Sequence, residues 1–140
     1  LPKWFSPPED ILKKSVAHRD MPFFAAFDGS KVIGFVALKV HNQYTVEMYN
    51  IGVLEAYHWQ GVGHAMLMAV ERFVKENGYK FITVKTLDAS AQYEPYERTR
   101  AFSFKNGFYP LEVFPLFWNK DNPCLFLAKY IGSCIPISEH

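Results

Sequence analysis

The chain has 140 residues, of which 49% are hydrophobic, and it carries a formal net charge of +1. This size and composition predict one folded domain with a single core. The basic excess typical of proteins that bind nucleic acid or anionic membranes is missing, so we expect neither partner. No apolar run reaches the length of a membrane span, and the first residues do not resemble a signal peptide.

A short helix is predicted over residues 6–17. Ser6 is a favourable N-cap, prolines follow in the first turn, and Glu9 stands where it completes a capping box. Apolar residues then recur at helical spacing. We expect this helix to contribute packing.

Three antiparallel strands are predicted next, over residues 23–27, 31–40 and 44–54. They are rich in β-branched and aromatic residues, and Asp28-Gly29-Ser30 between the first two is typical of a hairpin turn.

Residues 60–77 have apolar positions on one helical face and charged positions on the other, and Gly78 follows as a stop. Gly61 and Gly63 stand where this helix begins. Glycine lets a ligand approach the backbone closely, and the first N–H groups of a helix have no partner within it. The turn is therefore a candidate anion site, most simply for a phosphate. Taken alone, a Gly-x-Gly that merely ends a turn fits equally well.

The rest of the chain predicts strand, helix, strand and strand, over residues 79–87, 96–106, 108–114 and 124–131. The strand that follows the first long helix should lie parallel to the strand before it, in a right-handed crossover. Between the last two strands we expect a loop over residues 115–123 with two buriable aromatics, Phe117 and Trp118. The predicted fold is α+β, a mixed and mostly antiparallel sheet with a central parallel strand pair and helices on both faces.

Cys124 and Cys134 have no metal-ligand spacing, and we interpret them as reduced thiols in or near the core. Reduced thiols favour a cytoplasmic location. The histidines also lack metal-ligand spacing, so we expect no metal site.

The glycine turn resembles the acyl-CoA loop of the GNAT superfamily of N-acetyltransferases, which has the pattern Gln/Arg-x-x-Gly-x-Gly/Ala. His58, Gly61 and Gly63 take its fixed places, with histidine where the family prefers Gln or Arg. A second resemblance ends in Lys105-Asn106-Gly107-Phe108, and Thr99-Arg100-Ala101-Phe102 is similar to a form found in some bacterial members. The order of elements matches the family from its second strand onward. The family's first strand is expected to be missing or divergent.

This resemblance implies acetyl-CoA as cosubstrate, with its diphosphate on the main-chain amides of the turn and its pantetheine arm beside the preceding strand. The residues expected to bind it are Ile51, Val53, His58, Trp59, Gln60, Gly61, Val62, Gly63, His64, Ala65, Tyr96 and Thr99.

Transfer to an amine needs a group that takes the amine's proton, because a lysine-like amine with a pKa of about 10 is almost wholly protonated at neutral pH. Glu47 stands at the distance before His58 at which histone-type members carry a glutamate base. Tyr49 and Ile51 would share its face of the strand if no bulge intervenes. A solvated glutamate on a half-exposed strand is the equally weighted alternative.

The acid that protonates the leaving thiolate is harder to assign. Ser103 stands where the family often has a tyrosine, and contact with the cofactor is favoured over a catalytic role for it. Tyr93, Tyr96 and Tyr109 are further candidates.

The resemblance predicts an N-acetyltransferase that acts on a primary amine of a small molecule or peptide, with homodimerisation as a family tendency. Aromatic residues suggest an acceptor pocket with apolar walls, although for each of them a structural place in the core or over an edge of the sheet is the simpler interpretation. They are Tyr93, Tyr96, Phe114, Phe117 and Trp118. A catalytically silent acyl-CoA sensor and an unrelated α+β interaction domain are the alternatives.

Overall fold

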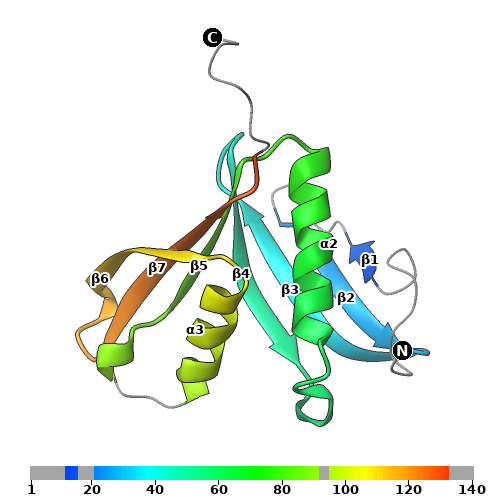
Figure 1. Cartoon of the computed structure of the whole chain (residues 1–140), viewed down its shortest axis with the longest axis horizontal. Helices are drawn as coiled ribbons and strands as arrows, with labels where there is room; N and C mark the ends of the chain where they lie inside the picture. Colours follow the sequence, from blue (N-terminus) through cyan, green and yellow to red (C-terminus); the bar gives the residue numbers. More distant parts are fainter. Residues whose placement is uncertain (1–11, 16–20, 92–94, 133–140) are drawn as a thin grey trace.

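Seven strands form one mixed sheet in the order β1-β2-β3-β4-β5-β7-β6 (Figure 1). The computed structural model describes residues 12–15, 21–91 and 95–132. The elements are β1 (Leu12–Ser15), β2 (Phe23–Asp28), β3 (Lys31–Val40), β4 (Thr45–Val53), η1 (Glu55–Tyr57), α2 (Val62–Glu76), β5 (Phe81–Leu87), η2 (Ala89–Ala91), α3 (Pro95–Lys105), β6 (Tyr109–Asn119) and β7 (Asn122–Tyr130). The predicted mixed sheet is confirmed.

The N-terminal helix predicted over residues 6–17 is wrong where the structure describes it. Leu12–Ser15 form β1, which pairs antiparallel with Phe23–Ala26 of β2. A strand of this length covers an edge of β2 that would otherwise leave backbone groups unpaired. A strand therefore precedes β2, where we expected none, and the rest of the predicted helix lies outside the described residues.

The parallel pair is β4 and β5, and it is short. The two strands pair only from Thr45↔Phe81 to Glu47↔Thr83. Beyond Glu47 they diverge, and Figure 1 shows the two halves of the sheet opening away from each other below this point. Glu47 therefore lies at the vertex where the sheet divides.

A β-bulge lies in β4 just after this vertex. Leu38 of β3 pairs with Met48 and Ala37 with Asn50, so Tyr49 is the extra residue. An extra residue reverses the alternation that follows it. Ile51 is therefore on the opposite face from Glu47, and the conditional expectation that the two share a face is wrong.

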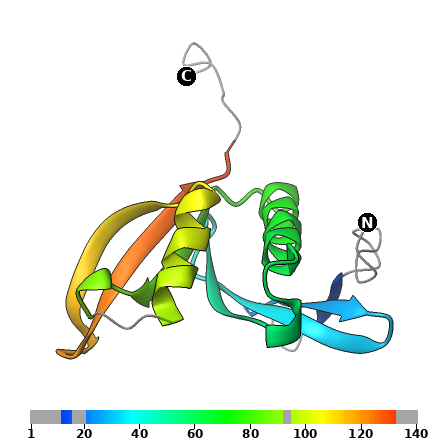
Figure 2. The same cartoon turned by 60° about the horizontal axis from the view of Figure 1, so that its bottom comes forward.

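Both described helices cover the same face of the sheet (Figure 2). The crossovers from β4 to β5 and from β5 to β6 advance in the same direction along the sheet, and right-handed crossovers in one direction put their helices on one side. The buried Arg100 fixes α3 there by donating from Nη1 to the carbonyl of Leu87, 2.6 Å away. We predicted helices on both faces, but none of the described residues forms an α-helix on the other.

The core lies between α2 and the sheet. The apolar face of α2 buries Val62, Met66, Val70 and Val74 against side chains of the central strands. Cys124 of β7 is also buried, as predicted, and burial raises the pKa of its thiol, so it stays protonated at neutral pH.

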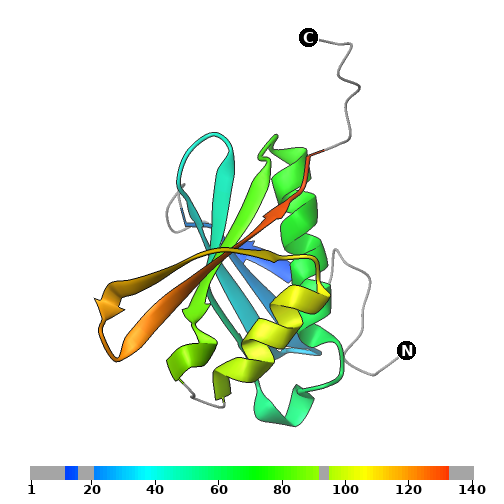
Figure 3. The ribbon, with the colours of Figure 1, turned by 60° about the vertical axis from the view of Figure 1, so that its left-hand side comes forward.

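The loop predicted over residues 115–123 is instead part of a long β6–β7 hairpin, which extends away from the helices in Figure 3. Its tight turn lacks the glycine that usually marks one. Asn119 holds it, since Oδ1 accepts from the amide of Asp121 at 3.0 Å and from Nδ2 of Asn122 at 2.8 Å. Phe117 and Trp118, the two aromatics that could have been buried there, are 54% and 46% exposed.

Candidate active site

The segment between β4 and α2 is a folded turn held by side chains. His58 Nε2 lies 2.9 Å from the carbonyl oxygen of Val53, and Gln60 Nε2 donates to the carbonyl of Ala56 at 2.9 Å. Tyr57 donates its hydroxyl to Asp28 Oδ2 at 2.6 Å, and this hydrogen bond raises the pKa of Tyr57. The turn is thereby fixed to the end of β4 and to the β2–β3 hairpin.

The N-terminus of α2 is open. Its N-cap is Gly61, which has a left-handed φ of 84°, makes no side-chain capping bond and has no acidic residue in the turn that follows. The first helical bond is donated by Ala65 to the carbonyl of Gly61 at 3.0 Å. The amides of Val62, Gly63 and His64 therefore lack partners within the helix, whereas the amide of Ala65, which we had included, is already used. Three free N–H groups at the positive end of a helix can hold an anion.

Arg98 of α3 reaches this turn, although sequence analysis did not identify it. Its guanidinium lies 4.9 Å from the centre of the Trp59 ring, and its Nη1 is 3.0 Å from His58 Nδ1. Arginine can only donate, so Nδ1 accepts and Nε2 carries the proton given to Val53. Trp59 is 82% exposed and has a left-handed φ of 67°, which is rare for a bulky side chain. A cation is thus held beside the open helix end.

The first turn of α2 also lies close to the C-terminal end of α3. His64 Nδ1 lies 2.9 Å from Asn106 Oδ1, and a Cβ at Gly63 would meet the Phe102 ring at 3.4 Å. Thr99 is partly buried on α3, and the side chain of Tyr96 lies outside the described part of the structure.

The Phe35 ring covers the end of β4 on the face of Glu47. A Cβ at Gly52 would come within 2.6 Å of this ring, so any larger residue there would have to displace it. Ile51, on the helix-covered face, is 36% exposed, and Val53 is partly buried. On β5, Thr86 Oγ1 is buried without a hydrogen-bond partner among the described residues. Beyond Glu47, β4 thus has a backbone edge that is not paired with β5, and the Thr86 hydroxyl is enclosed.

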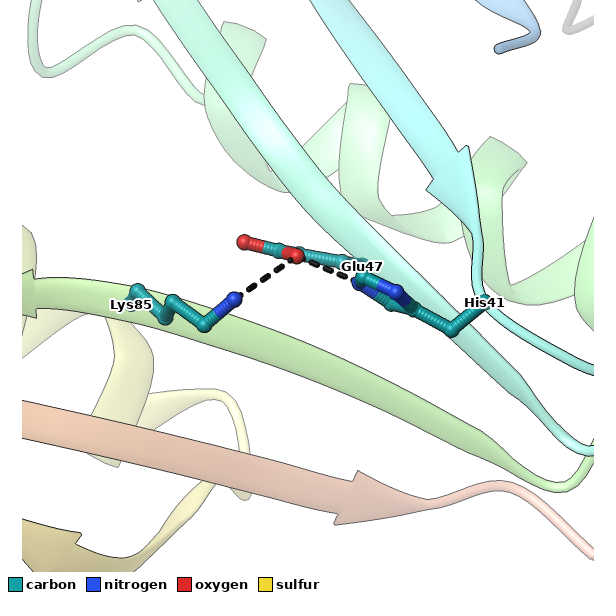
Figure 4. A network of polar contacts seen from close by, with 3 residues as sticks. All are labelled: His41, Glu47 and Lys85. Atoms are coloured by element: carbon teal, nitrogen blue, oxygen red, sulfur yellow. Dashed lines mark hydrogen bonds and ion pairs between the residues drawn. The ribbon is translucent and has the colours of Figure 1, made fainter. Parts of the chain in front are cut away.

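Glu47 lies at the vertex, on the face without described α-helices (Figure 4), and it is only 4% exposed. Its Oε1 is 2.6 Å from His41 Nε2 and 3.2 Å from Lys85 Nζ. The two partners come from the β3–β4 turn and from β5. The alternative of a solvated glutamate is therefore wrong, and neither partner was expected from the sequence.

An open pocket of ≈ 390 Å³ lies beside this network. Lys85 extends along one wall, with Nζ 5.0 Å from the centre of the Phe117 ring. Phe114 and Phe117, which we had named for an acceptor pocket, contribute to it, and Phe126 does so unexpectedly. The lining residues are His41, Thr45, Thr83, Lys85, Phe114, Phe117 and Phe126.

Ser103 is buried in α3, and its hydroxyl donates to the carbonyl of Thr99 at 2.9 Å. Its one hydrogen is therefore used inside the helix. This geometry gives no support to a role as catalytic acid.

Among the described residues, no group of three or more His, Cys, Asp or Glu side chains could hold a metal ion. No helix in the same part of the chain has the length and apolar character needed to cross a membrane.

A sequence model of the Acetyltransferase (GNAT) family matches residues 2–102. This chain belongs to the GNAT acetyltransferase family. No curated protein sequence matches it. The GNAT match covers the turn, the start of α2 and most of α3, which together form the open helix end described above.

Solved GNAT structures share the fold. A structure described as a GNAT-family acetyltransferase from Desulfovibrio desulfuricans aligns with a TM-score of 0.74 and 20% identity, over 81% of this chain and 71% of that one. A GNAT acetyltransferase from Elizabethkingia anophelis with acetyl-CoA bound gives 0.68 and 21%, over 79% and 76%. An aminoglycoside 6'-N-acetyltransferase in complex with coenzyme A gives 0.73 and 20%, over 91% and 79%.

Proposed function

We propose that this protein transfers an acetyl group from acetyl-CoA to a primary amine of an acceptor that is not identified. The observation that carries the proposal is the vertex of the sheet. Strands β4 and β5 diverge there, the open end of α2 lies on one face, and the buried carboxylate of Glu47 lies on the other. A donor and an acceptor can therefore meet between the strands from opposite faces.

The residues present fit a CoA thioester. The amides of Val62, Gly63 and His64 are free to bind a diphosphate, and no acidic side chain in the first turn of α2 opposes one. Arg98 adds a positive charge beside them. The thioester supplies an activated acyl group with a good leaving thiol. The edge of β4 beyond Glu47, which is not paired with β5, supports a place for its amide-bearing arm.

Glu47 is the proposed base. A carboxylate at the vertex can accept a proton from an ammonium group that enters the pocket, which leaves the amine lone pair free to attack. Lys85 and His41 fix the orientation of the carboxylate. The phenyl walls from Phe114, Phe117 and Phe126 favour an acceptor with an apolar part next to its amine.

Free thiol released from acetyl-CoA, measured over a panel of small-molecule and peptide amines, tests this function. We expect release with at least one amine that has an apolar neighbouring group, and a matching gain of acetyl mass on that amine. Binding of acetyl-CoA with no release for any amine would favour the silent acyl-CoA sensor instead. No binding of coenzyme A at all would contradict both.

Arg98→Gln should weaken coenzyme A binding about 10-fold, because one charge-assisted contact to a phosphate is lost. The loss should shrink at high salt, where such contacts are screened. Calorimetric titration at two salt concentrations measures it, with Arg72→Gln on the exposed face of α2 as the control. If Arg98→Gln and the wild-type protein bind coenzyme A with equal affinity, Arg98 does not belong to the phosphate site.

We further propose that residues 1–140 act as one domain in the cytoplasm, without a nucleic-acid or membrane partner. The exposed outer strand β6 leaves backbone groups available and supports the homodimer that the family resemblance implied.

A further inference from the structure

The proposed reaction releases a proton that must reach solvent. An ammonium group that becomes a neutral amide loses two protons, of which one ends on the leaving thiolate as a thiol. The second is left over in each turnover, and the proposed base that receives it, Glu47, has a side chain only 5% exposed. Glu47 must lose this proton before it can act again.

Among the titratable side chains that the described residues place next to Glu47, one can accept a proton, and the hydroxyl of Thr83, its neighbour on β5, is not basic at neutral pH. Lys85 Nζ, 3.2 Å away, is a donor only, and so is Lys39, which is opposite Glu47 on β3. The thiol of Cys124 is buried and, because burial raises its pKa, stays protonated. His41 Nε2, 2.6 Å from Glu47 Oε1, is the remaining neighbour, and an imidazole can take a proton on one nitrogen and release another from the second.

His41 also connects the buried carboxylate to water. Its side chain is 33% exposed, and it stands at the start of the β3–β4 turn, where its amide donates to the carbonyl of Thr45 at 3.0 Å. The ring lies with Nε2 toward Glu47 (Figure 4). A direct contact to solvent and a short contact to the base are combined in one side chain.

We propose that His41 is the proton outlet of the active site, a positioning residue that takes the proton from Glu47 on its unprotonated ring nitrogen and gives up the proton on its other nitrogen to water or buffer. A half-turn of the partly exposed ring then returns the unprotonated nitrogen to Glu47 for the next transfer. This inference rests on the proposed function. The proton taken from the acceptor passes to the carboxylate, then to the imidazole, and leaves with the solvent, so that Glu47 is ionised again and His41 is neutral.

His41→Gln tests the outlet, because glutamine can still hydrogen-bond to Glu47 but cannot carry a proton. In weak buffer we expect kcat to fall about 10-fold, less than the about 10²- to 10⁴-fold of a positioned base, because His41 does not take the proton from the substrate itself. Added imidazole should raise the kcat of the variant in proportion to the imidazole concentration. It should leave the kcat of the wild-type protein unaffected. Pyrazole, which has the same shape but is not basic at neutral pH, should restore nothing.

The matched control is Gln43→Ala in the same turn, which is exposed and should show normal kcat and no response to imidazole. Blanks without enzyme correct for direct acetylation of imidazole. A normal kcat for His41→Gln would overturn the inference, and so would a loss that imidazole does not repair, since that indicates a structural role only. If the unchanged protein releases no thiol with any amine, the proposed function fails instead.

Discussion

Glu47→Gln is expected to lower kcat about 10² to 10⁴-fold, the usual contribution of a positioned proton acceptor. Glutamine has nearly the same shape and can still accept a hydrogen bond, but it cannot take a proton. Coenzyme A affinity should not change, because its proposed contacts lie on the other face of the sheet. The deficit should decrease as pH rises toward the pKa of the acceptor amine, near about 10 for a lysine-like group, since more of that amine is then neutral without help.

The control for Glu47→Gln is Glu71→Gln. Glu71 Oε2 is 2.9 Å from Lys129 Nζ, so this variant also breaks a carboxylate–lysine pair, but on the helix-covered face. Steady-state rates and thermal melting of the two variants separate catalysis from stability. A similar kcat for both variants would mean that Glu47 has a structural role, and the base would have to be sought elsewhere.

Gly61→Val is expected to weaken coenzyme A binding about 10- to 100-fold. At a φ of 84° an L residue costs about 1–2 kcal/mol, and a β-branched one more. Relief of this strain moves the backbone out of the left-handed region and turns the first amides of α2 away from the anion site. Calorimetric titration with coenzyme A measures the loss.

Gly78→Val is the control for Gly61→Val. Gly78 lies just past the other end of the same helix with a φ of 75°, and a Cβ there would meet nothing within 4 Å. Both variants should lower the melting temperature to a similar extent, yet Gly78→Val should bind coenzyme A normally. If both bind normally, the amides after Gly61 are not the phosphate site.

The elements with strong local signals were predicted well. The sequence-based bounds of β3 coincide with the observed strand, and the glycine turn and α2 were correctly placed, because β-branched runs, helical periodicity and paired glycines act over a few residues. The hairpin turn at Lys120 and Asp121 was missed because a side chain of Asn119 holds it without a glycine. At β1, a four-residue strand carries too few positions to distinguish its spacing from that of a helix.

Site residues that belong to a local sequence motif were predicted. Those that join the site through a contact with a residue far away in the sequence were missed. Glu47 was identified by its position, but its partners His41 and Lys85 come from another turn and another strand. Arg98 reaches His58 across 40 positions of sequence, and no local pattern predicts that contact. The bulge at Tyr49 depends on pairing with β3, so the faces of β4 could not be assigned from alternation alone.

The division of the sheet at Glu47 has a consequence for how the protein would handle the acyl group. A donor on the helix-covered face and an acceptor on the opposite face can be present at the same time, with their reactive atoms facing each other between β4 and β5. The acyl group can then pass directly from the donor to the acceptor in one step. The proposed reaction therefore needs no covalent acyl-enzyme intermediate. Cys124 is buried and is not placed to form one.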